Sequence, residues 1–447
     1  MTASRFWNPK TETLPREDLR RLQGHRLSKL VERAYHTSAF HKRLFDEAGI
    51  GPADIQGYDD LLKIPFTTRD AWMDTQEAHP PYGDLLVSSE AQSIRYHTTS
   101  GTSGRTPLRV LDSRVDWKWI AECWCYGFWG AGVRSRDKVF FAFSYGTFIG
   151  FWGAHYACEK IGSLVLPSGN MNTQQRVGLI DEMGATVVCA TPTYALRLAQ
   201  EARELGIDLP RGPVERLILS GEPAGSIPAT KRLIEEQWGA QAFDTAGMTE
   251  IGTIMMFESE NQPGGTHIIE DHFIEEVIDP TTQEPVDYGV RGERVVTSFG
   301  RGAIPLIRYR TRDLVIKAPH TMSDCGRTWD LYDGGIRGRV DDMLLVRGTN
   351  VYPRAVESIV REYPAVDEFQ IYLWTRDGIR DEIAVRAEVR NGYEDQWGAV
   401  ARQLKADLST NTEGLGFHVE RVEPGTLPRF ELKAKRVLDE RIVKGSR

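Results

Sequence analysis

The sequence lacks any run of about 18 or more apolar residues, the length that a membrane-spanning helix needs, so it predicts no membrane span. The N-terminus, Met1 to Asn8, also lacks the apolar stretch of a signal peptide. Cysteine is scarce, with 5 in 447 residues. An odd number of cysteines scattered along a long chain does not suit a disulfide framework. We therefore expect a protein of the reducing cytoplasm.

Positive charge is in short supply as well. The chain carries 55 lysine and arginine residues against 63 aspartate and glutamate residues, which gives a net charge of −8, and it has no block of basic residues. This balance gives no support to nucleic-acid binding, although it leaves room for a local basic pocket that binds phosphate. The hydrophobic share of 40% and the charged share of 26% are typical of a globular protein. A chain of 447 residues is long enough for a large domain and a smaller one.

The middle of the chain alternates short apolar runs with helix-like stretches. The runs lie at residues 139–143, 163–166, 185–189 and 216–219. Continuous apolar runs of this length suit strands buried on both faces, and their alternation with helices predicts an α/β fold with mainly parallel sheets. A helical segment begins at Glu17, strands and turns follow at 273–317, and a tail about one small domain long comes after Gly338.

The segment from Tyr96 to Pro107, rich in glycine and hydroxyl residues, carries the first chemical signal. Its glycines let the backbone approach an anion closely, and its hydroxyl and N–H groups can then donate to phosphate oxygens. The spacing fits neither a Walker loop nor a dinucleotide-binding loop, and on this segment alone an ordinary surface loop stays the alternative. The residues expected to contact phosphate are Ser100, Gly101, Thr102, Ser103 and Gly104.

Further motifs follow this loop in a fixed order. They lie at residues 220–223, 244–250, 309–313, 338–353 and 427–436. In sequence and in order they resemble the motifs of the adenylate-forming superfamily, which includes acyl-CoA ligases, luciferases and peptide-synthetase adenylation domains. The similarity is greatest to the phenylacetate–CoA ligase branch, and it covers nearly the whole chain, including Phe6 to Pro9 and Ile64 to Asp70. The resemblance implies a large ATP- and acid-binding domain over 1–338 and a mobile α+β lid domain over 339–447.

The resemblance also implies a reaction. The chain would use ATP and Mg²⁺ to activate an aryl carboxylic acid as an acyl-adenylate, release pyrophosphate, and pass the acyl group to the thiol of coenzyme A. Two alternatives stay open: transfer to an amine or a carrier-protein thiol, and a non-enzymatic nucleotide-binding protein descended from the family. The expected partners are a small carboxylic acid and coenzyme A, with no nucleic acid and no membrane. The oligomeric state is left open, with a homodimer as one alternative.

Carried over motif by motif, the resemblance assigns roles to single residues. Lys433 in the closing loop would bridge the carboxylate and phosphate oxygens as they approach, and Lys435 is the alternative. Thr249 and Glu250 would hold the α-phosphate and Mg²⁺, which prefers hard oxygen ligands. Asp313 would accept hydrogen bonds from both ribose hydroxyls. The other residues expected at ATP or AMP are Gly221, Glu222, Pro223, Asp244, Ala246, Gly247 and Arg339.

The lid residues follow from the same resemblance. Asp341 would be the hinge about which the lid rotates between adenylation and thiol transfer. The alternative is that Asp341 only pairs with a nearby arginine. In the second lid position the transfer loop, Gly348, Thr349 and Asn350, would face the thiol.

Several positions depart from the family's pattern. Ala246 stands where the superfamily commonly has an aromatic ring against adenine, and Phe430 and Leu432 replace the usual Thr and Gly beside the lysine. Many relatives in the branch carry a zinc site, of which His267 and Cys325 remain here, but Ser323 replaces one cysteine and Ser259 or Glu260 falls near the other. Two soft ligands are too few for a closed tetrahedral zinc site, so we expect no structural zinc.

The pocket for the acid should lie at the carboxyl ends of the parallel strands. The aromatic side chains expected there favour an aryl or arylacetic acid, although an aromatic stripe is as often part of a hydrophobic core. The residues expected to line this pocket are Tyr145, Phe148, Phe151 and Tyr194.

Overall fold

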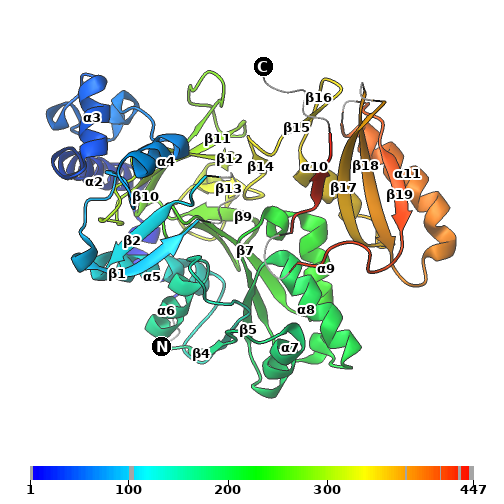
Figure 1. Ribbon diagram of the computed structural model, residues 1–447. Coiled ribbons are helices and arrows are strands. Elements are labelled where there is room, and N and C mark those ends of the chain that lie inside the picture. The colour runs from blue at the N-terminus through cyan, green and yellow to red at the C-terminus, as the bar shows by residue number, and fades with distance from the viewer. Residues whose placement is uncertain (1–3, 100–104, 378–379, 413, 431–433, 442–447) are drawn as a thin grey trace.

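The computed structural model describes residues 4–99, 105–377, 380–412, 414–430 and 434–441. The expected phosphate loop, Ser100 to Gly104, lies outside the described residues, and so do Leu432 and Lys433. Figure 1 shows a large body of helices and strands with a smaller lid, coloured orange and red, on one side of it.

The body is built on a 12-stranded mixed sheet. Five neighbouring strands in the order β4-β3-β5-β6-β7 pair in parallel, which confirms the expected α/β class. These strands are β3 (Lys138–Phe141), β4 (Leu164–Pro167), β5 (Val187–Ala190), β6 (Arg216–Leu219) and β7 (Gln241–Gly247). The helices between and beside them are α5 (Arg114–Gly130), α6 (Trp152–Ile161), α7 (Thr173–Glu182), α8 (Pro192–Glu204) and α9 (Pro228–Trp238).

Both faces of the parallel sheet are buried, as continuous apolar runs require. Along β5, Val187 and Cys189 pack into a cluster with residues of α5 and α6. The alternate residues, Val188 and Ala190, pack into a second cluster with residues of α7, α8 and α9. Successive side chains of a strand point to opposite faces, so one short strand contributes to two separate cores.

Beyond β7 the sheet continues with antiparallel strands. They are β8 (Ile254–Ser259), β9 (Gln262–Ile268), β10 (Phe273–Ile278), β11 (Arg291–Ser298), β12 (Tyr309–Ala318), β13 (Leu331–Asp333) and the short β14 (Gly338–Arg339), which pairs with β12. The segment at 273–317, where the sequence predicts strands and turns, forms β10, β11 and most of β12.

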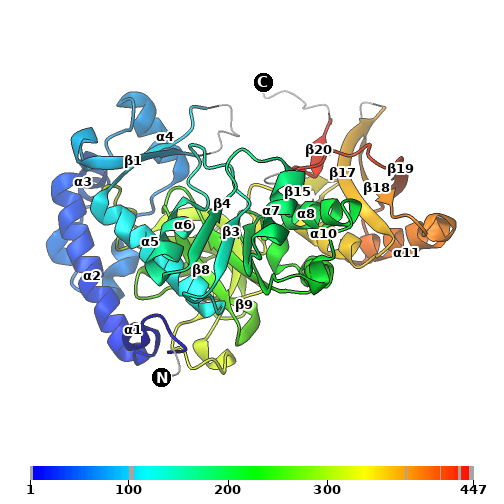
Figure 2. The ribbon, with the colours of Figure 1, turned by 90° about the horizontal axis from the view of Figure 1, so that it is seen from below.

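The N-terminal region covers the far end of the body from the lid, as Figures 1 and 2 both show in blue and cyan. Its first helical stretch is divided at Ser38, which leaves the helical conformation and accepts a hydrogen bond from the N–H of His41 at 3.3 Å. Its elements are α1 (Pro9–Glu12), α2 (Arg16–Thr37), α3 (Ala39–Glu47), α4 (Arg69–Ala78) and the hairpin of β1 (Ser93–Thr98) and β2 (Arg109–Ser113).

The lid has its own sheet, in the order β19-β18-β17-β20, and its own hydrophobic core. Val346 is the first buried residue of that core, whereas Arg339 still pairs with β12 of the body. The lid elements are β15 (Leu344–Val346), β16 (Thr349–Val351), α10 (Pro353–Arg361), β17 (Val366–Arg376), β18 (Arg380–Val389), α11 (Trp397–Thr410), β19 (His418–Val422) and β20 (Val437–Asp439). Within the described residues, no helix is both long and apolar enough to cross a bilayer.

Candidate active site

Two of the sequence motifs reach the site just beyond the ends of the neighbouring strands β6 and β7, and a third lies on β12. Gly221 and Glu222 follow β6 after one intervening residue, Ser220, and Thr249 and Glu250 lie in the turn between β7 and β8. Asp313 lies on β12, where its main chain pairs with Arg339 of β14. The carboxyl ends of parallel strands meet at one edge of the sheet, which is where open α/β sheets bind their ligands.

A buried arginine holds the backbone of the turn that carries Thr249 and Glu250. Arg301 donates through Nη1 to the carbonyl oxygens of Thr249 at 2.7 Å and Glu250 at 2.8 Å. Its remaining donors form a bidentate pair with Asp112 of β2 at 2.7 and 2.9 Å. Arg301 thus links this turn to the hairpin strand that follows residues 100–104, and bidentate geometry makes the link specific.

Close packing at the start of the same turn requires glycine. A Cβ on Gly247 would stand 2.5 Å from the carbonyl oxygen of Thr253, closer than a methyl group can come. The neighbouring Ala246 is partly buried and packs against a small cluster that includes Met256 and Tyr332. Its methyl group cannot stack on an adenine ring, so the aromatic contact common in the superfamily is missing at this position.

The carboxylate of Glu250 is buried and forms an ion pair with Arg69 through Oε1. The hydroxyl of Tyr309 lies 3.5 Å from the same oxygen. Arg69 also donates to Oγ1 of Thr99, the last described residue before the expected phosphate loop, at 3.3 Å. A carboxylate so placed suits one hard ligand of Mg²⁺, whose remaining ligands are usually water and phosphate oxygens.

Asp313 is the buried carboxylate expected at the ribose. Its Oδ1 lies 3.4 Å from Nη1 of Arg339, and its Oδ2 lies 3.9 Å from Nη1 of Arg294. Burial raises the pKa of Asp313, and the guanidinium groups of Arg339 and Arg294 oppose that rise. Arg294 is itself fully buried and paired with Glu275, so its position beneath Asp313 is fixed by the core.

Asp244 lies deeper than its motif suggests, with only 5% of its surface exposed. Burial raises the pKa of its carboxyl to about 8, Glu258 adds to the rise, and Arg354, Lys231 and a hydrogen bond with Ser226 oppose it. The side chain of Arg354, at the start of the lid helix α10, donates to the carbonyl and hydroxyl oxygens of Ser226 at 3.2 and 2.9 Å. Asp244 therefore contributes to the contact between body and lid.

The turn after β6 is glycine-dependent and meets the lid. Gly221 has φ of +99°, a conformation that residues with a Cβ rarely adopt, and Pro223 then begins the short 3₁₀ helix η5 (Pro223–Ser226). The carboxylate of Glu222 accepts hydrogen bonds from the N–H groups of Thr193 at 2.7 Å and Ala434 at 3.1 Å. Ala434 directly follows Lys433, whereas the alternative lysine, Lys435, is exposed.

The expected hinge and transfer loop lie on the surface of the lid. Asp341 is exposed and pairs with Arg339, Oδ2 to Nη2, at 3.1 Å. Gly348 has φ of +86° and follows Arg347, which has φ of +52°, so these two residues make the tight turn between β15 and β16. Thr349 and Asn350 begin the second strand of that hairpin.

The aromatic residues expected around the acid divide into two groups. Tyr145, Phe148 and Phe151 lie together on the α5–α6 face, where the hydroxyl of Tyr145 is 3.1 Å from Nδ1 of His155. Tyr194 does not join them. It is fully buried in the cluster on the opposite face, with its hydroxyl oxygen accepting a hydrogen bond from Arg176 at 2.8 Å. The cap at Thr191 starts α8, and Tyr194 in its first turn packs into that second core, so its place in the acid pocket stays a prediction.

Arg69, Arg301 and Arg294 are site residues that the motifs missed. Arg69 falls in the segment from Ile64 to Asp70, which the resemblance did include, and its place one residue before an acidic residue at a helix start carries no specific signal. Arg301 and Arg294 contact partners far away in sequence, and no local pattern marks them.

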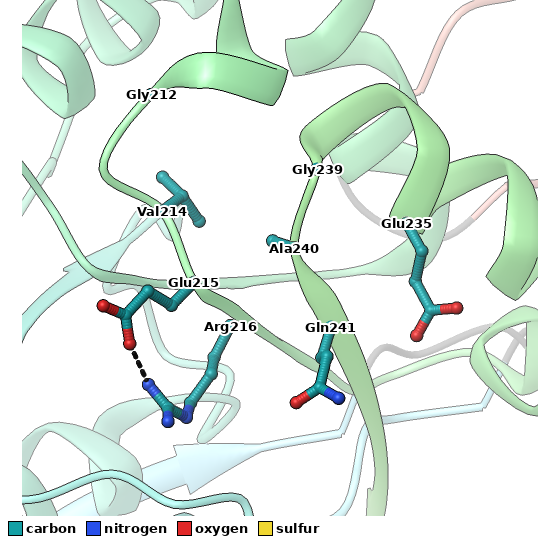
Figure 3. Close-up of a pocket in the computed structure, with 8 residues that line it drawn as sticks. All are labelled: Gly212, Val214, Glu215, Arg216, Glu235, Gly239, Ala240 and Gln241. Carbon is teal, nitrogen blue, oxygen red and sulfur yellow. Dashed lines mark hydrogen bonds and ion pairs between the residues drawn. The ribbon is translucent and has the colours of Figure 1, made fainter.

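A hollow of about 660 Å³ opens at the other end of the same strands (Figure 3). Arg216 and Gln241, which line it, are the first residues of β6 and β7, whereas the motifs follow the last residues of these strands. The hollow is thus separate from the candidate site.

The residues left over from the zinc site of the branch form a pair. Nε2 of His267 lies 3.3 Å from Sγ of Cys325, and both side chains are buried. In the part of the chain that the structure describes, no three His, Cys, Asp or Glu side chains are grouped to hold a metal ion. The absence of structural zinc stays a prediction, which metal analysis of the purified protein would test.

Comparison with known proteins gives the family. The family model of the AMP-binding enzyme C-terminal domain matches residues 348–441. Phenylacetate-coenzyme A ligase of Thermus thermophilus is 36% identical over 453 residues, covering 97% of this chain and 99% of the relative. The crystal structure of 2-hydroxyisobutyryl-CoA ligase in the postadenylation state with R3-HIB-AMP is 29% identical, covers 98% of this chain and 93% of its own, and has a TM-score of 0.92. The same ligase in the thioesterification state, with 2-HIB-AMP and CoA, is 30% identical, covers 99% and 94%, and has a TM-score of 0.75. The chain belongs to the adenylate-forming acyl-CoA ligases and is an AMP-forming acid–CoA ligase that works through an acyl-adenylate.

Proposed function

We propose that the acid is an aryl or arylacetic acid. The observation that carries this proposal is the aromatic cluster of Tyr145, Phe148 and Trp152 beyond the carboxyl end of β3, in which the rings of Tyr145 and Trp152 meet edge to face at 4.8 Å. Aromatic walls favour an aromatic ring over a small hydrophilic acid. The 36% identical relative, named for phenylacetate, supports the same class.

A small branched hydroxy acid is the second candidate. It is favoured by one observation, the TM-score of 0.92 with a ligase named for 2-hydroxyisobutyrate. Acid-dependent exchange of pyrophosphate into ATP distinguishes the two, because it reports adenylate formation without coenzyme A. We expect phenylacetate and benzoate to support exchange far better than 2-hydroxyisobutyrate and acetate. Exchange that is fastest with 2-hydroxyisobutyrate would overturn the aryl proposal.

In the proposed adenylation step a carboxylate oxygen of the acid attacks the α-phosphorus, and the bond to the pyrophosphate oxygen breaks. Lys433 bridges the two approaching groups, and Thr249 contacts the α-phosphate. Mg²⁺, when bound at Glu250, neutralises phosphate charge. Asp313 holds the ribose, and Arg301 fixes the backbone of the Thr249–Glu250 turn; its two hydrogen bonds of 2.7 and 2.8 Å support that role. Positioning of this kind supplies most of the catalysis in phosphoryl chemistry.

In the second proposed step the thiol attacks the acyl carbon and AMP leaves, after the lid has rotated about Asp341. The higher TM-score with the postadenylation state than with the thioesterification state supports a lid that stands in its first position here. The transfer loop Gly348–Asn350 comes to the site only in the second position. We also propose the cytoplasm as the compartment, supported by five cysteines that are all free and buried.

A further inference from the structure

The expected catalytic lysine has a neighbour that is fastened to the body of the enzyme. Ala434, the next residue, donates its N–H to Oε2 of Glu222 at 3.1 Å. The other oxygen of the same carboxylate accepts the N–H of Thr193 at 2.7 Å. One carboxylate therefore joins the lid segment that follows Lys433 to the first turn of α8.

We call this contact between Glu222, Thr193 and the lid the dock. It includes a second lid residue, two positions after Ala434. Arg436 of the lid is buried and lies 3.4 Å from Oγ1 of Thr193 through both Nη1 and Nη2. Within the lid, Arg436 is held by Glu357 at 3.1 Å and Glu368 at 2.9 Å. The lid presents a rigid arginine and a backbone N–H to the start of α8, and Glu222 and Thr193 receive them.

The position of this contact is suited to one lid position. Glu222 and Thr193 belong to the body, whereas Ala434 and Arg436 belong to the lid, so rotation of the lid breaks these bonds. A bond made in one of two states shifts the equilibrium toward that state by its own free energy. Ala434, which one of these bonds holds, directly follows Lys433 in the sequence.

We propose that Glu222 is a positioning residue that docks the Lys433 segment for adenylation and takes no part in thiol transfer. This inference rests on the proposed role of Lys433. It also changes the expected role of Glu222. Each oxygen of the carboxylate accepts one N–H of the protein, so the Glu222 side chain has a structural role that needs no contact with the nucleotide.

Glu222→Gln is the informative variant. The amide keeps one acceptor oxygen, which can satisfy Thr193 or Ala434 but not both, and its NH₂ group faces the other donor. Helix α8 keeps its N-cap, Thr191, in this variant, so we expect the fold to remain stable. The matched control is Arg232→Gln, which breaks an exposed ion pair between the same body and lid, 2.9 Å from Glu362, away from Lys433.

The parent, both variants and Lys433→Ala are compared in the separate half-reactions, using the best acid of the exchange panel. For Glu222→Gln we expect kcat of pyrophosphate exchange to fall about 10- to 100-fold, the loss of one well-formed hydrogen bond to a charged group, with KM for ATP within about twofold. Transfer to coenzyme A from synthetic acyl-adenylate should keep the parent rate. Arg232→Gln should match the parent in both.

Three results overturn the inference: unchanged exchange in Glu222→Gln, an equal loss in both half-reactions, or a loss confined to the KM for ATP, which would make Glu222 a nucleotide contact. Lys433→Ala separates this inference from the proposed function. Normal exchange in Lys433→Ala refutes the role of Lys433. If exchange is abolished in Lys433→Ala but normal in Glu222→Gln, only the proposed role of Glu222 is refuted.

Discussion

Arg339 donates through Nη2 to Oδ2 of Asp341 across 3.1 Å, at the junction of the two domains. Its other terminal nitrogen lies 3.4 Å from Asp313, the carboxylate proposed to hold the ribose. The same guanidinium therefore contacts the expected hinge and the expected nucleotide site. If the ribose binds Asp313 and the lid rotates about Asp341, as we propose, both events would involve the side chain of Arg339.

Asp341→Pro should form acyl-adenylate at a rate near that of the parent but fail to transfer the acyl group. Proline fixes φ near −65°, so it prevents the backbone change that rotation of the lid requires. Single-turnover assays of each half-reaction measure this. Asp341→Ala is the control, because it also loses the ion pair with Arg339 but keeps a free backbone. If alanine and proline slow transfer equally, the ion pair and not the hinge is responsible.

Asp313→Ala should weaken ATP binding by roughly 2–4 kcal/mol, since two hydrogen bonds from the ribose to a shielded carboxylate are lost and such terms do not simply add. Ala246 offers no ring for adenine, so little else can compensate at that end of the nucleotide. Titration calorimetry with ATP is the measurement, beside Thr249→Ala at the phosphate end. An affinity within a few-fold of the parent would mean that the ribose is held elsewhere.

Lys433→Ala should lower pyrophosphate exchange by orders of magnitude and leave transfer from synthetic adenylate intact, because only contacts of the transition state are removed. Lys435→Ala should behave like the parent, since Lys435 is exposed. The reverse pattern would assign catalysis to Lys435.

Arg301→Met should lower the free energy of unfolding by about 3–5 kcal/mol, because it leaves the buried carboxylate of Asp112 without its partner. Urea unfolding followed by tryptophan fluorescence gives the value. The double variant with Asp112→Asn should recover part of the loss. A single variant as stable as the parent would contradict the buried pair at 2.7 and 2.9 Å.

Asp244 should make the protein less stable as the pH rises from about 5 to 8. Burial raises the pKa of its folded-state carboxyl from 3.8 to about 8, so between these values the folded protein keeps a proton that the unfolded chain has lost. The stabilisation from this proton is then full below the lower pKa and falls by about 1.4 kcal/mol per pH unit up to the higher one. Asp244→Asn should flatten this dependence between pH 5 and 8 in thermal unfolding. An unchanged slope would show that the carboxyl is ionised in the folded state.

The parallel sheet could be predicted because its signals are local. The apolar run at 216–219 is β6 residue for residue, and the runs at 139–143 and 185–189 contain most of β3 and β5. The nucleotide motifs were found in the same way, since each lies within a few consecutive residues.

Other features could not be predicted, because they depend on residues far apart in sequence. Arg301 and Asp112 are 189 positions apart, and no sequence pattern near either residue indicates that they form an ion pair. The face on which Tyr194 lies is set by where α8 begins, and a shift of one residue rotates a helical side chain by about 100°. Apolar character alone cannot fix that rotation.

The alternation along β5 has a consequence for how this enzyme can change. Residues at 187 and 189 belong to the core that supports the aromatic cluster, while those at 188 and 190 belong to the core behind α8, on which the lid docks. Substitutions in the proposed acid pocket would change the packing of the first core and leave the packing of the second core largely as it is. Substrate choice and lid docking would then depend on side chains that point to opposite faces of the same strand, so that each could change without the other.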